Sequence, residues 1–204
     1  VSGVHTGIVF LSASVLLALV IRRRKTRAAI AMLAVVAFAL VAGARVASLR
    51  AALMIAIYLA AELFDREPDA PNALGIAAFI FAIFNPALIF DGGFQLSFLS
   101  IASILLFREA LAARFEALPM GVRDGLAASV GVQLLPLPVA LHLFHVLPLL
   151  APLINLAVVP LLALVLWIAL AASVAAFVAP PVAVLFGHAA APVIGIIELA
   201  SERV

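Results

Sequence analysis

Long apolar stretches separated by short polar breaks make up nearly the whole chain. A helix crosses the hydrocarbon core of a bilayer with about 20 mostly apolar residues, and roughly 17 to 25 are tolerated. Segments on that scale can be marked out at 3–21, 28–44, 46–64, 73–90, 93–107, 126–145, 151–177 and 181–199. Since 93–107 is short enough to be a tilted or re-entrant half-helix, the pattern predicts seven or eight spans. The expected fold class is all-α, a polytopic transmembrane helical bundle with broken or re-entrant segments.

Two polar linkers interrupt this pattern. The first, 65–72 (DREPDAPN), carries prolines that break a helix. The second, 108–124, alternates charged and apolar residues at helical spacing, so that Leu111, Phe115 and Leu118 can face the bilayer while the charges stay in water. That spacing predicts an amphipathic helix at the membrane interface.

Composition agrees with a membrane protein. Hydrophobic residues make up 68% of the chain and charged residues 11%, and the mean hydropathy is +1.35, whereas a soluble domain is about half apolar and a quarter charged. No Asp, Glu, Lys or Arg occurs between Gly125 and Ile197. Cysteine is absent, which excludes disulfides and thiolate chemistry within the chain.

The positions of the cations predict an orientation. Short loops rich in Lys and Arg stay on the cytoplasmic side, and the first loop holds Arg22, Arg23, Arg24, Lys25 and Arg27. Alternation of the spans then puts both termini outside the cytoplasm. The first apolar segment precedes its basic cluster, opposite to a signal peptide, and the chain begins at Val1. We therefore expect residues 1–204 to be one membrane-embedded domain cut from a larger protein.

Polar residues inside the predicted spans are the candidates for function, because a bilayer penalises them unless they are paired or hydrated. The first group is Ser2, Gly3 and His5 at the outer end of the first span, where glycine allows close helix approach. His5 can equally be a capping or packing residue. The group therefore predicts a helix contact rather than a ligand.

The second group is a stripe along one predicted helix. Arg50, Met54, Tyr58 and Glu62 follow each other at i, i+4 spacing and so share one helical face. The stripe can line a polar passage. The alternative is that Arg50 snorkels to one interface while Glu62 lies at the other.

The third group surrounds the segment 90–98, FDGGFQLSF. Pro86 is expected to end the preceding helix, and Gly92 and Gly93 to act as hinges. The polar side chains of Asp91, Gln95, Ser97 and Ser100 can then line a cavity at a helix start whose positive dipole end favours an anion. The alternative is an ordinary loop in which Asp91 is an N-cap.

The fourth group lies in 133–160. Pro136 and Pro138 are expected to kink or break their span, and Gln133 and Asn155 to form hydrogen bonds across helices. His142 and His145 lack a third ligand nearby, so neither a metal nor any other cofactor is expected. The sequence also contains no nucleotide-binding loop, dinucleotide fingerprint or hydrolase motif, which predicts a protein that is not an enzyme.

Three segments carry a resemblance to a known family: VSGVHTG at 1–7, the block 50–101 with its FQLSF sequence, and LLPLPVALHLFHVLPLLAPLINLAVVPL at 134–161. In these segments the chain resembles the membrane-embedded competence domain of the ComEC family. The resemblance implies a channel domain in the bacterial inner (plasma) membrane that translocates single-stranded DNA into the cytoplasm during natural transformation. Relatives commonly carry an OB-like domain upstream and a metallo-β-lactamase-like domain downstream. This chain contains neither, nor the H-x-H-x-D-H motif of the latter.

The partners implied by the resemblance are single-stranded DNA, membrane lipids and the DNA-uptake machinery with its cytoplasmic motor; a homo-oligomer is compatible with it. A strand needs surfaces on which its bases stack, and Phe94 and Phe98 are the candidates for one. Two other functions remain open. One is a small-molecule or lipid transporter with Glu62 as its buried acid, and the other is a non-conducting scaffold for extracytoplasmic domains.

Overall fold

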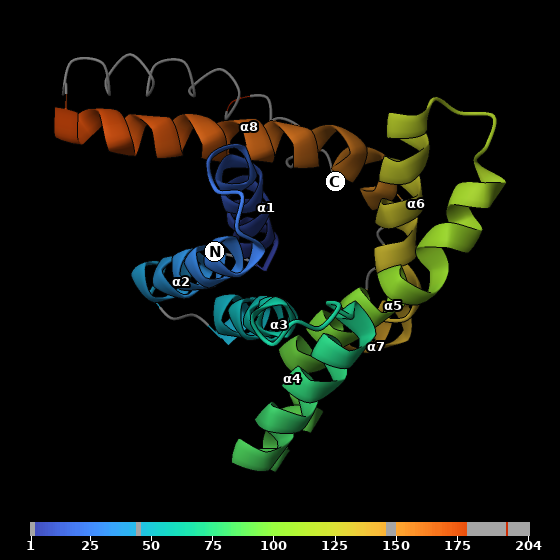
Figure 1. Ribbon diagram of the computed structural model, residues 1–204. Helices are drawn as coiled ribbons and strands as arrows, with labels where there is room; N and C mark the ends of the chain where they lie inside the picture. The colour runs from blue at the N-terminus through green and yellow to red at the C-terminus, as the bar shows by residue number, and fades with distance from the viewer. Residues whose placement is uncertain (1–2, 44–45, 146–149, 179–194, 196–204) are drawn as a thin grey trace. The chain divides into compact units, whose positions relative to one another are not determined.

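The computed structural model describes residues 3–43, 46–145, 150–178 and 195 (Figure 1). Every regular element in this part of the chain is helical, which confirms the all-α prediction. In chain order the elements are α1 (Gly3–Val20), α2 (Arg24–Val41), α3 (Val46–Leu63), α4 (Ala70–Phe84), η1 (Pro86–Phe90), α5 (Gly92–Arg114), α6 (Met120–Leu134), α7 (Leu137–Phe144) and α8 (Ala151–Val178).

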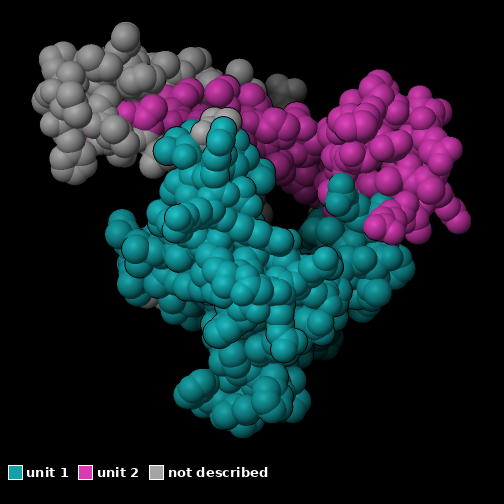
Figure 2. Space-filling view, viewed as in Figure 1, with its two compact units in different colours: residues 1–108, 131–146 teal, residues 109–130, 147–204 magenta. Residues whose placement is uncertain are grey.

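The chain forms two compact units (Figure 2). The first unit comprises Val1–Arg108 and Gly131–Val146, and the second comprises Glu109–Val130 and Leu147–Val204. Two of the three boundaries between them fall within α5 and α6, and the third falls in the sequence between α7 and α8. The candidate site described below belongs entirely to the first unit.

The first unit is built around α2, which packs against both α1 and α3. Four buried residues recur along α2 at intervals of three or four, and so form one helical face: Ala28, Ala31, Val35 and Ala39. Small residues allow helix backbones to approach closely in a membrane, where packing replaces the hydrophobic effect as the driving force. Phe10 of α1 and Ile55 of α3 pack against this face.

Helices α3, α4 and α5 share an aromatic cluster. Phe94 and Phe98 of α5 lie with ring centroids 4.3 Å apart, and Phe81 of α4 makes edge contacts with both, at 6.2 Å and 6.4 Å. Met54 of α3 and Ala77 of α4 complete the buried core. Edge-to-face and offset aromatic pairs stabilise a core by about 0.5–1.5 kcal/mol beyond the area they bury, so this cluster joins the three helices.

In the second unit, α6 lies close to α8 at Gly125. A Cβ on that glycine would stand 2.6 Å from Leu156 Cδ1, so only glycine fits there without a shift of Leu156. Pro160 lies inside α8. The last predicted span, 181–199, falls outside the described residues.

Three described helices are long and apolar enough to cross a membrane: α3, α5 and the part of α8 from Ala151 to Ala169. A fourth span results if α6 and α7, which meet at a 60° bend, are taken together. The predicted count of seven or eight is thus not confirmed. One reason is visible at α2, which begins at Arg24 and so includes three cations among its 18 residues.

Two predictions about the middle of the chain are wrong. Segment 93–107 is not a half-helix, because α5 continues without a break for 23 residues, from Gly92 to Arg114. The interfacial amphipathic helix at 108–124 does not form as a separate element. Its first part extends α5, Phe115 and Leu118 lie in turns, and α6 begins at Met120. Pro119 explains the break, since a residue before proline avoids the helical region.

Candidate functional site

A buried arginine and a capping carboxylate bring the starts of α3 and α5 together. Asp91 precedes α5, and its Oδ1 accepts a hydrogen bond from the backbone N–H of Phe94 at 2.7 Å. The same oxygen lies 3.9 Å from Nη1 of Arg50, in the second turn of α3. One carboxylate oxygen therefore serves the helix terminus and the guanidinium together. This confirms the N-cap interpretation of Asp91.

The two charges differ sharply in exposure. The side chain of Arg50 is 6% exposed, whereas that of Asp91 is 52% exposed. Within the described part of the chain Nε of Arg50 has no hydrogen-bond partner. Burying a charge is unfavourable unless it is closely paired, and 3.9 Å is too long for a hydrogen bond. The cation of this pair is thus the poorly compensated member.

Gly92 and Gly93 form the first turn of α5 and make room for their neighbours. A Cβ on Gly93 would lie 3.2 Å from Asp91 Oδ1 and 3.7 Å from Arg50 Nη2, and one on Gly92 would lie 2.5 Å from Cδ1 of Leu143. The structure therefore gives these glycines a role in close packing, against the charged pair and against α7. Their predicted role as hinges stays a prediction.

The short segment between α4 and α5 satisfies its own polar groups. Pro86 ends α4 as expected and begins η1, while Oδ1 of Asn85 accepts a hydrogen bond from the Ala87 N–H at 3.2 Å. Gln95 Nε2 donates to the carbonyl oxygen of Ile89 at 2.9 Å. The Gln95 amide thus fastens this segment onto α5, and Ser97 lies half-buried further along the helix.

At its other end α3 is joined to the start of α2 by ion pairs. Glu62 Oε2 lies 3.4 Å from Nε of Arg24, and the Glu62 side chain is 12% exposed. Asp65 and Lys25 form a second pair at 2.5 Å, with both side chains more than half exposed. The predicted stripe on α3 therefore has a charge contact at each end.

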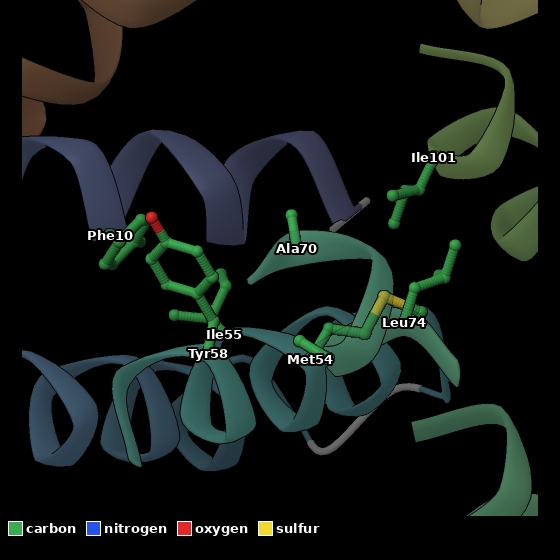
Figure 3. A pocket seen from close by; sticks show the side chains of 8 residues that line it. Phe10, Met54, Ile55, Tyr58, Ala70, Leu74 and Ile101 are labelled. Atoms are coloured by element: carbon green, nitrogen blue, oxygen red, sulfur yellow. The ribbon is translucent and has the colours of Figure 1, made fainter. Parts of the chain in front are cut away.

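Between those ends, Met54 and Tyr58 line a cavity of about 230 Å³ (Figure 3). Its other walls come from α1, α4 and α5: Phe10, Ala70, Ala73, Leu74 and Ile101, with Ile55 of α3. The Tyr58 ring rises from α3 at the end of the cavity where Phe10 lies. The lining is apolar apart from the Tyr58 hydroxyl.

Tyr58 is also part of the walls of two further cavities. One, of about 320 Å³, reaches Arg27 and Glu62, and the other, of about 490 Å³, reaches Arg66, Asp69 and Asn72. The structure thus places Tyr58 between an apolar cavity in the helix bundle and two cavities with charged residues in their walls.

The proposed stacking surface is wrong. Phe94 is 7% exposed and Phe98 is 8% exposed, because both rings pack into the cluster with Phe81 and Met54. Buried rings cannot meet a base without unpacking three helices.

Sequence reasoning missed Ser103, which joins α5 to the bend between α6 and α7. Its hydroxyl donates to the carbonyl oxygen of Gly131 and accepts from the Leu135 N–H at 3.0 Å. If α6 continued through Leu135, these two backbone groups would bond to each other. The Ser103 hydroxyl is instead inserted between them, which is a known cause of helix kinks. Pro136 and Pro138 follow directly, which confirms the predicted break. The signal was the i, i+3 series Ser97, Ser100 and Ser103 in an apolar helix.

The remaining predicted residues belong to neither α3 nor α5, the two helices that Arg50 and Asp91 bring together. Ser2 is outside the described residues, and Gly3 and His5 belong to the first turn of α1. Gln133 is half-buried at the end of α6 in the first unit, and Asn155 is half-buried on α8 in the second. No three of the described His, Asp and Glu side chains are grouped as metal ligands.

The long apolar helices are typical of a helical membrane protein, and comparison with known families identifies its family. A family model described as Competence protein matches residues 1–203. The chain therefore belongs to the competence protein family, and its resemblance to the ComEC competence domain is confirmed. No curated protein and no solved structure matched the chain.

Proposed function

We propose that this domain forms part of the path along which single-stranded DNA crosses the bacterial inner membrane into the cytoplasm during natural transformation. The single observation that carries the proposal is the arrangement along α3 in a chain of the competence family. A buried cation lies at one end of that helix, and toward the other end Tyr58 is part of the walls of three cavities.

The orientation follows from the charges. The cluster at 22–27 is on the cytoplasmic side, so the ends of α2 and α3 that carry Arg24 and Glu62 face the cytoplasm. Arg50 and Asp91 then belong to the extracytoplasmic side. The domain is a multi-pass protein of seven or eight spans with both termini outside the cytoplasm.

Tyr58 is the common residue along this path. All three cavities have Tyr58 in their walls, so a strand that follows this path passes the phenol ring. The domain carries out no chemistry itself. Its partners are the DNA strand, membrane lipids, a cytoplasmic motor that pulls the strand, and further copies of the chain if the channel is a homo-oligomer.

The absence of cysteine in the sequence allows a direct test. Tyr58→Cys introduces one thiol into this domain at the junction of the cavities, and Phe79→Cys introduces one on α4 at a position that is 66% exposed. Each variant replaces the resident protein in a transformable bacterium, which is treated with a bulky thiol reagent before labelled DNA is added.

We expect the reagent to reduce DNA uptake strongly in the Tyr58→Cys strain, relative to untreated cells of the same strain. Uptake by Phe79→Cys cells should be unchanged by the reagent. Equal uptake by treated and untreated Tyr58→Cys cells, with labelling verified by mass spectrometry, contradicts the proposal.

The cavity of about 230 Å³ favours a second candidate, a transporter of a lipid or small apolar molecule, because its lining is apolar. This candidate predicts flux of such a molecule across proteoliposomes that contain the protein, blocked by the reagent at position 58. It also predicts no loss of DNA uptake when the protein is deleted, which separates the two functions.

A further inference from the structure

Arg50 is a buried cation whose charge is only partly balanced. Its side chain is 6% exposed. Its ion-pair partner among the described residues is Asp91, at 3.9 Å. Nε has no partner within the same part of the chain. A buried charge in this state favours the approach of a further anion, or of a closer one.

The first turn of α5 adds a second positive feature at the same place. The first amide N–H groups of a helix have no partner within the helix, and the dipole of the helix makes this end positive. Since α5 has 23 residues, its dipole is fully developed. The Phe94 N–H is already used by Asp91, whereas the Gly92 and Gly93 N–H groups precede the first hydrogen bond inside the helix, from Gln95 to Asp91.

Asp91 occupies the position that an external anion would take. Its Oδ1 lies within reach of both the helix amide and the guanidinium, yet its side chain is 52% exposed. An exposed side chain can rotate away when the incoming anion replaces its cap hydrogen bond, whose loss alone would destabilise the helix. Gly93 has no Cβ, and one would lie 3.2 Å from Asp91 Oδ1 and 3.7 Å from Arg50 Nη2. Gly93 therefore adds no side-chain atom to the space between the helix start and the guanidinium, which Asp91 Oδ1 occupies.

We propose that Arg50 and the first turn of α5 form a binding site for a phosphodiester group, and that Asp91 is an internal competitor that fills the site when no ligand is bound. The inference rests on the proposed function, since the DNA backbone is the source of the phosphodiester. Helix N-termini bind phosphate through backbone amides and the dipole, and arginine contributes a planar pair of donors to phosphate oxygens. An incoming phosphate displaces Asp91 from both.

The competing explanation is that Asp91 is simply the structural partner of Arg50. The two explanations predict opposite effects for Asp91→Asn, which retains an N-capping oxygen and removes the negative charge. If Asp91 competes with the ligand, the variant binds phosphodiesters more tightly. If Asp91 is a structural partner alone, the variant gains no affinity and loses stability.

The test uses the protein that contains this domain, in nanodiscs of zwitterionic lipid, with a fluorescent oligothymidylate as probe and inorganic phosphate as competitor. Asp91→Asn should tighten oligothymidylate binding by roughly three- to tenfold, in line with the effect of a charge at a helix N-terminus. Arg50→Gln should weaken binding by at least about tenfold, as expected for a lost charge-assisted contact, and Arg50→Lys by less.

Arg123 and Asp124 provide matched controls. Arg123 Nε and Asp124 Oδ1 form an ion pair at 3.2 Å, and neither residue belongs to the proposed site. Arg123→Gln and Asp124→Asn change the net charge by the same amounts and should leave binding within about twofold of the wild type, because both variants retain Arg50 and Asp91. Thermal unfolding of every variant shows which of them fold. If Arg50→Gln does not fold, the comparison of Arg50→Lys with the wild type still decides the test.

The inference is overturned if Asp91→Asn binds the probe no more tightly than wild type, or if both Arg50 variants bind like the Arg123 control. If phosphatidylglycerol in the nanodiscs abolishes the Arg50-dependent binding of the probe, the phosphodiester that the site takes is a lipid headgroup, and its assignment to the DNA backbone is overturned. If binding depends on Arg50 but the label at position 58 does not affect DNA uptake, the site is supported and the proposed function is contradicted. If the label at position 58 blocks uptake but binding does not depend on Arg50, the function is supported and the site is contradicted.

Discussion

Ser103 of α5 donates a hydrogen bond to the carbonyl oxygen of Gly131 in α6, and its side chain is fully buried. The same hydroxyl accepts a hydrogen bond from the Leu135 N–H. The bend removes the backbone hydrogen bond between Leu135 and Gly131, and Ser103 of α5 provides a partner for both groups. The bend of 60° between α6 and α7 is therefore a property of two segments that are distant in sequence.

Ser103→Ala should lower the free energy of unfolding by about 1–3 kcal/mol, because it leaves buried backbone groups unsatisfied. Ser100→Ala, at a half-buried position one helical turn earlier, is the control and should change it by less than about 0.5 kcal/mol. Denaturant titration of the protein in mild detergent measures both. Equal effects at the two positions would show that the bend depends on the prolines alone.

Gly92→Ala should lower the free energy of unfolding by less than the roughly 1–3 kcal/mol that overpacking costs in a closed core. The added Cβ would come 2.5 Å from Leu143 Cδ1, but that atom ends a flexible side chain that is 45% exposed and can turn aside. The double variant Gly92→Ala with Leu143→Ala should recover part of the loss, and a double-mutant cycle of unfolding measurements gives the coupling. Gly121→Ala, where no atom lies within 4 Å of the added Cβ, serves as the matched control. Strictly additive effects at 92 and 143 would rule out the predicted clash.

The inner face of α2 should reject larger side chains. Ala39 is 1% exposed, while Ala37 on the same helix is exposed. Ala39→Leu should lower stability by about 1–3 kcal/mol through overpacking, and Ala37→Leu should be close to neutral. The midpoint of thermal unfolding in detergent compares them. If Ala37→Leu is the more harmful substitution, the face assigned to the bundle interior is the wrong one.

The two ion pairs that α2 makes with Glu62 of α3 and with Asp65, just after α3, should differ in strength. Glu62 is 12% exposed and Asp65 is 75% exposed, and exposed pairs contribute about 0–1 kcal/mol. Glu62→Gln should therefore cost more stability than Asp65→Asn, and the Glu62 effect should persist at high salt, where exposed pairs are screened. Unfolding at low and high salt tests this. A larger effect at Asp65 that does not change with salt would contradict the expectation that the less exposed pair contributes more to stability.

Much of the site was predictable where one residue type forces a local geometry. Proline ends a helix through its own ring, so the breaks at Pro86 and Pro136 follow from sequence. An acid directly before a helix start is a cap, and Asp91 is one. The stripe on α3 was predictable from spacing, although its middle residue Met54 proved to be core.

Tertiary contacts decided what sequence could not. The charged end of 93–107 looked like a boundary, yet α5 extends past Arg108 to Arg114. Phe94 and Phe98 have the spacing of an exposed pair as much as of a core pair, and Phe81, on another helix, determines the outcome. Ser103 bonds to residues about 30 positions away, which no local pattern encodes.

The alanine face of α2 also bears on how the first unit assembles. Alanine has no side-chain rotamers to lose, so docking α2 between α1 and α3 carries almost no penalty in side-chain entropy. Long apolar side chains at the same positions would have to be ordered before they packed. The entropic cost of ordering side chains in the first unit therefore falls on the residues that pack against α2, such as Phe10 and Ile55, and on the aromatic rings of α4 and α5.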